Sequence, residues 1–359
     1  MEFSDHILLQ VLRDPEKMAT LSLSEWDALK PLARSTLVIS KIAALAHKLD
    51  LLDLLPEQIV PHLTSAHVFA ARHDRAVRWE VNRVQRALRD VNTPIILLKG
   101  AAYAISNMAC ATGRVYGDTD ILVLKDRLGE VENSLTRHGW DTDEDNEYDE
   151  RYYRTWLHEL PPMRHRERGT VLDVHHNILP RIDKLQINIQ LLFESAIPIN
   201  GTKVCVLSPP DMVLHSAAHL FRIGNFDHGL RDLADLDELI RQFNNLDGFW
   251  DSVLDRAQQL KLTLPWYSAT RYVEYLFHTP IPDRVKRTVA KWAPLWPEVP
   301  IIDRLVKRAV LPRKIDDRDV RRQMAISLLG HWPLPRLKVT MTGLFWIKRM
   351  PWFAKQEKT

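Results

Sequence analysis

Glycine and cysteine are scarce in this chain of 359 residues, which holds 12 glycines and two cysteines, Cys110 and Cys205. Two cysteines without C-x-x-C spacing exclude a disulfide framework and favour a reducing setting. No apolar run reaches the roughly 18 residues that a membrane-spanning helix needs. The first residues also lack the basic segment followed by an apolar run of a signal peptide. The sequence therefore predicts a globular, cytoplasmic protein.

The chain has no strong excess of charge of either sign. Its 49 Lys and Arg residues against 46 Asp and Glu residues give a net charge of +3, which is too small to indicate a nucleic-acid-binding protein. Hydrophobic residues make up 45% of the chain, enough for a sizeable core. This composition excludes disordered and collagen-like proteins.

The residues before the first glycine, Gly100, have a helical pattern. Residues 36–52 are densely apolar, and apolar residues recur at steps of three and four within residues 65–92. Arginines occupy the other faces of this second segment and could meet nucleic acid, but interspersed acids favour a solvated face. We expect an N-terminal helical region over residues 1–92.

After Pro94 the pattern changes to short apolar runs that are typical of strands. Strands are expected over residues 95–98, 120–124, 152–157, 170–176 and 203–207, and helices over residues 101–108 and 130–138. Gly139 is expected to end the second of these helices, and residues 141–150 form an acidic loop. The sequence thus predicts a small mixed-sheet α/β core over residues 93–208.

Helical spacing returns after Ser208, which predicts a C-terminal helical domain over residues 209–330. Residues 331–359 form a basic aromatic tail with five Trp or Phe residues, six Lys or Arg residues and a single acid. Such a tail suits weak contact with a membrane surface or an acidic partner, or docking on its own domain. The expected fold class is α+β, with a small sheet core flanked by two helical regions.

Two acids begin a predicted strand within the sequence RVYGDTDILVL. Asp118 and Asp120 are two residues apart, so strand geometry places both side chains on one face. Adjacent carboxylates repel each other unless cations neutralise them. The preceding Gly117 and the strand–turn–helix segment ILLKGAAYAI upstream distinguish this pair from the other Asp-x-Asp pairs of the chain. We interpret the pair as a metal-binding site.

A third acid, Asp173, lies in a predicted strand with the sequence TVLDVHH. It alternates with apolar neighbours and shares a face with His175. An acid in a buried strand needs a cation or hydrogen-bond donors. Asp173 is therefore a candidate for the third carboxylate of the metal site, or is bonded to nearby backbone donors.

Together, LLKG, R-x-x-G-D-x-D-I-L-V and L-D-V-H-H resemble the nucleotidyltransferases of the DNA polymerase β superfamily. More narrowly, the sequence is similar to a bacterial group of uncharacterised nucleotidyltransferases, over roughly residues 35–280. The resemblance implies two Mg²⁺ (or Mn²⁺) ions held by Asp118, Asp120 and Asp173, which would be the catalytic residues. It also implies a nucleoside triphosphate such as ATP as substrate.

The resemblance further implies that Gly100 is the glycine of a turn that cradles the triphosphate. The superfamily has Ser or Gly at the next position, whereas this chain has Ala101, so a hydroxyl contact is missing and only backbone N–H donors remain. Lys99 and Arg114 flank the turn and the acids as candidate counter-charges for the triphosphate. Gly117 completes the expected nucleotide-binding residues.

Histidines supply the remaining candidates. His215 and His219 are four residues apart on a predicted helix, but the motif lacks the glutamate of a zinc-protease helix, and we expect the pair to bind no zinc. His175 and His219 are expected to support the site from outside it, with His219 paired to Asp232.

The predicted function is Mg-dependent transfer of a nucleotidyl group from a nucleoside triphosphate to a hydroxyl of a small molecule, glycan or peptide. One alternative is toxin-like nucleotidylation of tRNA or protein, for which the Arg-rich helix is the only support. Another is a non-catalytic nucleotide-binding or scaffold protein, which Ala101 keeps open.

Overall fold

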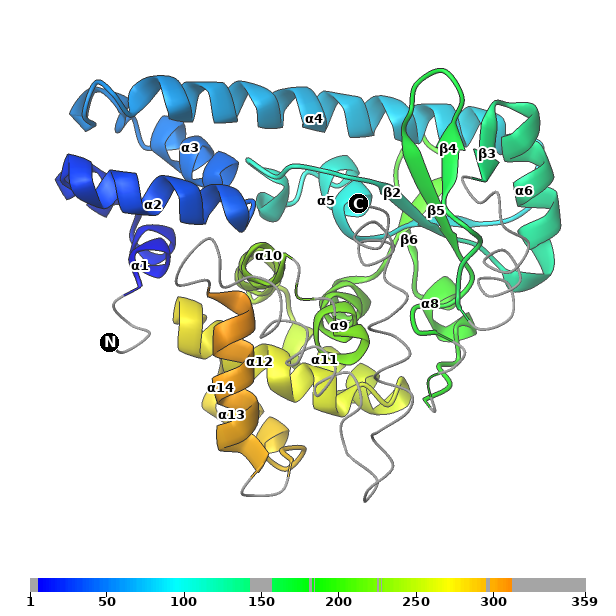
Figure 1. Cartoon of the computed structure of the whole chain (residues 1–359). Coiled ribbons are helices and arrows are strands. Elements are labelled where there is room, and N and C mark those ends of the chain that lie inside the picture. The colour runs from blue at the N-terminus through cyan, green and yellow to red at the C-terminus, as the bar shows by residue number, and fades with distance from the viewer. Residues whose placement is uncertain are drawn as a thin grey trace, which may run out of the picture.

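The computed structural model describes residues 6–142, 157–180, 183, 185–224, 226, 228–294 and 298–311. Helices α1 (Ile7–Arg13), α2 (Leu23–Ser35), α3 (Ile39–Lys48) and α4 (Val60–Ala87) precede the first strand, with the 3-10 turns η2 (Pro15–Thr20) and η3 (Leu52–Leu54). The predicted apolar stripe of α4 is buried at Val77, Val81 and Val84. Figure 1 shows α4 running along one side of the molecule.

A seven-stranded mixed sheet forms the centre of the fold, with strand order β3-β4-β5-β2-β1-β7-β6. The strands are β1 (Ile95–Leu97), β2 (Thr119–Leu122), β3 (Trp140–Thr142), β4 (Met163–His165), β5 (Val171–His175), β6 (Ile197–Pro198) and β7 (Val204–Val206). Strand β2 pairs in parallel with β5 and antiparallel with β1. The parallel pairing matters most for function, because it brings two distant parts of the sequence into one register.

Short helices connect the strands. They are α5 (Lys99–Ile105), α6 (Leu128–Arg137) and α8 (Gln190–Glu194), with the 3-10 turns η4 (Ala109–Ala111) and η5 (Lys125–Arg127). Gly139 follows α6 with a φ of 98°, so the predicted left-handed helix end is confirmed.

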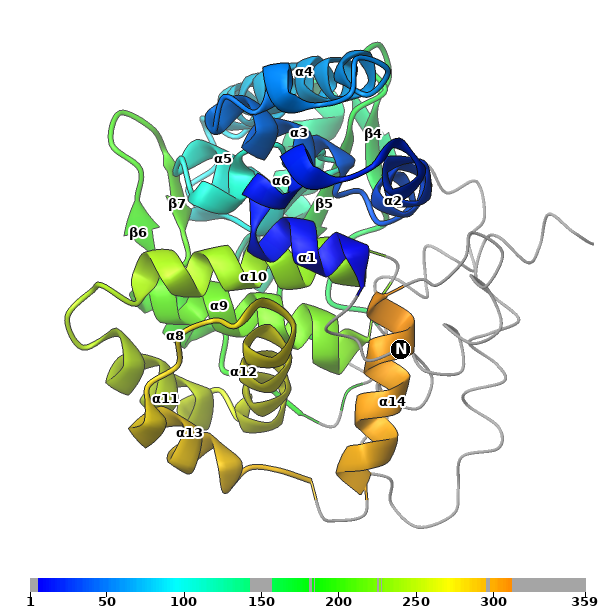
Figure 2. The same ribbon diagram turned by 90° about the vertical axis from the view of Figure 1, so that its left-hand side faces the viewer.

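The helices after the sheet are α9 (Pro209–Ala218), α10 (Gly229–Phe243), α11 (Phe249–Gln259), α12 (Thr263–Phe277), α13 (Asp283–Ala290) and α14 (Glu298–Val310), and the π-helical segment η6 (His219–Ile223) extends α9. In both views α9 and α10 lie between the α4 side of the molecule and helices α11 and α13 (Figures 1 and 2). One continuous apolar core extends from Leu8 to Leu311. Within the described ranges, no helix is both long enough and apolar enough to cross a bilayer.

The predicted α+β class is confirmed: every described strand lies between Ile95 and Val206, with helices before and after. Two expectations were wrong. The start of the predicted acidic loop is strand β3, and residues 163–165 form strand β4, where no strand was predicted. Residues 152–156 of a predicted strand, most of the acidic loop and the basic aromatic tail lie outside the described residues. The division into domains at residues 92, 208 and 330 stays a prediction.

Candidate active site

The site is built on the parallel pair β2 and β5. Asp120 is directly opposite Asp173 in this pairing, and Leu122 is opposite His175. Because the side chains of a strand alternate between two faces, Asp173 and His175 lie on the same face as Asp120. One ligand atom from each of Asp120, Asp173 and His175 lies within 4.8 Å of the other two. The structure thus brings together two of the three predicted acids and His175.

Asp120 is held by two partners. Its Oδ1 accepts a hydrogen bond of 2.9 Å from Lys99 Nζ and lies 3.0 Å from His175 Nε2. The Asp120 side chain is almost fully buried, and burial alone would raise its pKa; the charges and hydrogen bonds of Lys99 and His175 outweigh this and hold that pKa well below its usual range. Asp120 is therefore a carboxylate in the folded protein.

Asp173 is in the opposite situation. Its Oδ1 atom is buried and has no hydrogen-bond partner. Burial and the neighbouring Asp120 charge raise the pKa of Asp173 to about 7. A buried oxygen without a partner is costly unless a cation or a donor joins it, so Asp173 Oδ1 is a candidate ligand for a cation.

Asp118 lies just before β2, and its side chain is exposed. The charge of Asp120 raises the pKa of Asp118, and the protein atoms that displace part of the water around its carboxylate add to the effect. Asp118 therefore lies at the solvent side of the cluster, close enough for the charge of the cluster to affect it. The neighbouring Gly117 has open space beside it, because an added Cβ would meet no atom within 4 Å. The cluster of converging ligand atoms contains His175 as its third member rather than Asp118.

The Lys99–Gly100–Ala101 segment starts helix α5 directly after β1. Lys99 has a φ of 43°, in the left-handed region that few residues other than glycine adopt. Its ammonium group reaches Asp120, and although burial opposes its charge, Asp120 raises the pKa of Lys99 to about 12. The side chain of Ala101 is buried in the core. The segment therefore contributes the Lys99 ammonium group and its own backbone atoms to the site.

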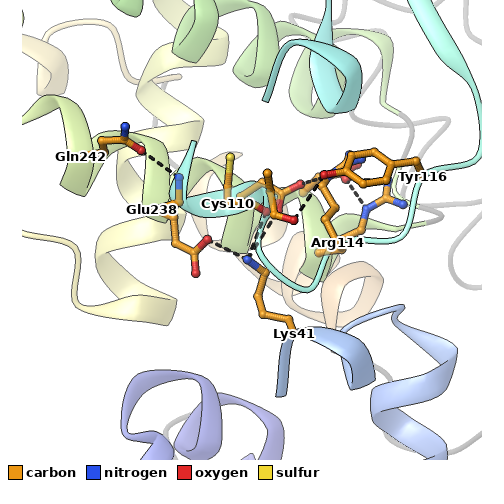
Figure 3. A network of polar contacts seen from close by, with 11 residues as sticks. Lys41, Cys110, Arg114, Tyr116, Glu238 and Gln242 are labelled. Carbon is orange, nitrogen blue, oxygen red and sulfur yellow. Dashed lines mark hydrogen bonds and ion pairs between the residues drawn. The ribbon is translucent and has the colours of Figure 1, made fainter. Parts of the chain in front are cut away.

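Gly100 packs beneath two side chains from the loop before β2. A Cβ placed on Gly100 would lie 2.4 Å from Arg114 Nη1 and 2.8 Å from Tyr116 Cδ1. Arg114 is buried, donates from Nε to Asp235 Oδ2 at 2.7 Å, and stacks over the rings of Tyr103 and Tyr116. Figure 3 shows Arg114 beside Tyr116 within this network. Arg114 is thus engaged by Asp235; its role as a counter-charge for a triphosphate stays a prediction.

Residues 22–278 match the model of a family described as uncharacterised nucleotidyltransferases. The chain belongs to this family. It is a nucleotidyltransferase, as the resemblance of its motifs implied. A comparison with curated protein sequences finds no significant match.

Two solved structures are similar to this nucleotidyltransferase. The antibiotic-resistance factor ANT(2'')-Ia aligns with a TM-score of 0.35 and 14% identity, over 57% of this chain and 98% of that one. An antigenic nucleotidyltransferase-like protein from Paracoccidioides brasiliensis aligns with a TM-score of 0.31 and 15% identity, over 59% of this chain and 93% of that one.

Histidines surround the acids of this nucleotidyltransferase more densely than the sequence suggested. His158 lies against His175, with their ring centroids 5.1 Å apart, and Glu159 Oε2 is 3.0 Å from His175 Nδ1. Sequence reasoning missed His158 and Glu159, because they lie in a segment without apolar periodicity that joins β5 through a single bridge. Only the acid–histidine composition of the segment could have drawn attention to it.

His215 and His219 lie on α9 and at the start of η6. Burial and the charge of Lys99 lower the pKa of both side chains, so both imidazoles are neutral beside the site. Asp232 forms an ion pair of 2.8 Å with Arg231, whereas the sequence suggested a pairing with His219. In the described part of the chain, neither histidine belongs to a cluster of three converging ligand atoms; that this pair binds no zinc stays a prediction.

Proposed function

We propose that this nucleotidyltransferase transfers a nucleotidyl group from a nucleoside triphosphate to a hydroxyl of a small molecule, glycan or peptide, and that the reaction depends on Mg²⁺ or Mn²⁺. The observation that carries the proposal is the register of β2 and β5, which places Asp120 opposite Asp173 with a buried, unpartnered Asp173 Oδ1. Family membership supports nucleotidyl transfer in general.

The residues present fit a magnesium site. Carboxylate oxygens are the ligands that Mg²⁺ prefers, and the buried Asp173 Oδ1 has no other partner in the structure. We assign Asp120 and Asp173, with Asp118 at the solvent side, as the residues that would hold two ions. When bound, the ions would supply positive charge to the attacking and leaving oxygens of the transfer.

The chain's own residues then have separate tasks. The acceptor oxygen forms a bond to the α-phosphorus while the bond from this phosphorus to the pyrophosphate oxygen breaks, and pyrophosphate leaves. Asp173 orients the acceptor hydroxyl and accepts its proton. Lys99, whose ammonium already lies 2.9 Å from Asp120 Oδ1, balances charge on the triphosphate side.

The nucleotide would be bound where Gly117 and the start of α5 flank the acids. Gly117 leaves open space beside Asp118, and the Lys99–Gly100–Ala101 backbone offers N–H donors at the helix start. Arg114 would position this segment, because it packs against Gly100 and is held by Asp235. His175 would orient Asp120 through its Nε2 atom.

A thermal-shift measurement tests this proposal. We expect at least one of the four common nucleoside triphosphates to raise the melting temperature of the protein when Mg²⁺ or Mn²⁺ is present. A ligand at a hundred times its Kd stabilises the fold by about 2.7 kcal/mol. Asp118→Asn should weaken this stabilisation, because a ligand charge is lost while the volume is kept. The matched control Asp126→Asn, at an exposed acid of η5, should respond as the wild type does. A metal-independent shift, or an unchanged shift in Asp118→Asn, contradicts the proposal.

A further inference from the structure

A second group of side chains with metal-ligand chemistry lies beside the acids. His158, Glu159 and His175 each present a ligand atom, and these three atoms lie within 4.8 Å of one another. The backbone fixes this arrangement, because His176 N donates to His158 O at 2.7 Å and Leu160 N donates to Val174 O at 2.9 Å. The segment that carries His158 and Glu159 is therefore tied along β5 next to His175.

Two nitrogen atoms in this group are buried without a hydrogen-bond partner. One is Nδ1 of His158, whose side chain is only 8% exposed. The other is Nδ1 of His175, which lies 3.0 Å from Glu159 Oε2 but makes no aligned hydrogen bond to it. Buried polar atoms in folded proteins almost always have a partner. A cation shared by the three side chains would supply the missing partner to His158 Nδ1 and would bind His175 Nδ1 together with the neighbouring Glu159 Oε2.

We propose that His158, Glu159 and His175 form a site for a transition-metal ion such as Zn²⁺, separate from the carboxylates assigned to magnesium. Two imidazole nitrogens and one carboxylate oxygen form a set that zinc takes when it keeps an open fourth position. Mg²⁺ prefers oxygen ligands, so the two sites differ in the ion that they select.

The site is coupled to Asp120 through the other nitrogen of His175. His175 Nε2 lies 3.0 Å from Asp120 Oδ1 while Nδ1 faces Glu159. A carboxylate that accepts from the far nitrogen of a metal-bound histidine is a recurring arrangement, which fixes the tautomer and the ring orientation. An ion on Nδ1 would thus hold His175 as a donor to Asp120. Binding of the ion does not depend on the proposed function; only its effect on transfer does.

Metal titration of chelator-treated, full-length protein tests the proposal. We expect Zn²⁺ to bind at one equivalent per chain in calorimetry with excess Mg²⁺ present, and Co²⁺ to give the visible absorption of a histidine-ligated ion. His158→Ala should weaken Zn²⁺ binding by about 100-fold or more, since removal of even an outer partner costs 10–100-fold. His62→Ala, at an exposed histidine of α4, is the matched control and should bind as the wild type does.

Further variants keep the outcome decisive. If His158→Ala does not fold, Glu159→Gln keeps the volume of the side chain and should also weaken Zn²⁺ binding. Asp118→Asn and Asp173→Asn should keep the Zn²⁺ equivalent, since neither residue belongs to the group. No stoichiometric Zn²⁺ in the wild type, equal binding in His158→Ala or Glu159→Gln, or loss of binding in Asp173→Asn overturns the proposal. A failure of nucleotide binding leaves this titration unchanged, so the two proposals fail separately.

Discussion

At the scale of single residues, Asp120 and Asp173 are opposite one another but differ in their partners. Burial opposes the ionisation of both side chains, and Lys99 and His175 overcome this only for Asp120. Asp173 instead meets the charge of Asp120, and its Oδ1 has no hydrogen-bond partner. The same substitution should therefore have opposite effects on stability at the two positions.

In the absence of divalent cations, Asp173→Asn should stabilise the fold by about 1–3 kcal/mol at pH 8, because each unit of raised pKa corresponds to about 1.4 kcal/mol. Asp120→Asn should destabilise it by about 3 kcal/mol, since Lys99 and His175 lose their buried carboxylate. Urea unfolding followed by circular dichroism measures both changes, and Asp126→Asn is the control. Equal signs for the two variants would contradict this account of the cluster.

His215 makes the stability of the fold depend on pH. Burial and the charge of Lys99 lower its pKa from 6.5 to about 3. Asp120 opposes this decrease, and His175 adds to it. Between these pH values the unfolded chain binds a proton that the folded chain does not bind. The free energy of unfolding should therefore decrease as the pH falls through this window, by about 1.4 kcal/mol per pH unit from this group.

His215→Gln should remove that part of the slope, because glutamine does not titrate. Urea unfolding at pH 7, 6 and 5 gives the slope for the wild type and the variant, with exposed His62→Gln as the control. Identical slopes for the wild type and His215→Gln would show that His215 takes up its proton in the folded state.

At the scale of elements, the start of α5 shows how one packing contact reverses a local preference. Gly100 and Gly129 are each the second residue of a helix, α5 and α6. Alanine favours helices over glycine by about 1 kcal/mol. Gly129→Ala should stabilise the fold by about 0.5–1 kcal/mol, because its Cβ would meet nothing within 4 Å.

Gly100→Ala should instead destabilise the fold by about 1–3 kcal/mol, since its Cβ would press on Arg114 and Tyr116. Thermal unfolding of the two alanine variants decides between packing and helix propensity. Stabilisation of both variants to the same extent would contradict the packing that we describe.

The elements that the sequence could predict are those with a clear local pattern. Strands β1, β2, β5 and β7 could be predicted from their apolar runs, and helix α4 from its apolar stripe. Burial of a continuous run or of one helix face leaves such a pattern in the sequence. Strands β3 and β4 could not be predicted in this way, because the polar residues Asp141 and Arg164 interrupt their apolar pattern. Each of these strands forms through pairing with its neighbour. His158 and Glu159 reach the site through one bridge to His175, a long-range contact that leaves no periodic signal.

At the scale of the whole molecule, a buried ionic network connects the N-terminal helical region, the loop before β2 and helix α10. Lys41 on α3 pairs with Glu238 at 2.7 Å and lies 3.9 Å from Asp235, which also accepts from Arg114. Figure 3 shows Lys41 reaching toward Glu238 from a separate helix, with Arg114 nearby. No sequence pattern predicted this network, because its members are up to 197 positions apart.

Asp235→Asn should destabilise the protein by about 3–5 kcal/mol, since Arg114 and Lys41 are left with less compensation in a buried place. Asp251→Asn, which breaks an exposed pair with Arg284, should cost far less, because water screens that pair. The urea midpoints of the two variants give the comparison. Similar losses for both would mean that the network does not hold the helical regions to the sheet.

Pyrophosphate release from a nucleoside triphosphate, with Mg²⁺ and a mixture of small-molecule and peptide acceptors, shows whether the paired acids of β2 and β5 are catalytic. We expect the wild type and Asp126→Asn to release pyrophosphate at equal rates. Asp120→Asn and Asp173→Asn should be slower by about 1,000-fold or more, a loss of about 4 kcal/mol of transition-state stabilisation. Release at the wild-type rate by Asp120→Asn or Asp173→Asn would contradict the assignment of the paired acids of β2 and β5 as the catalytic site.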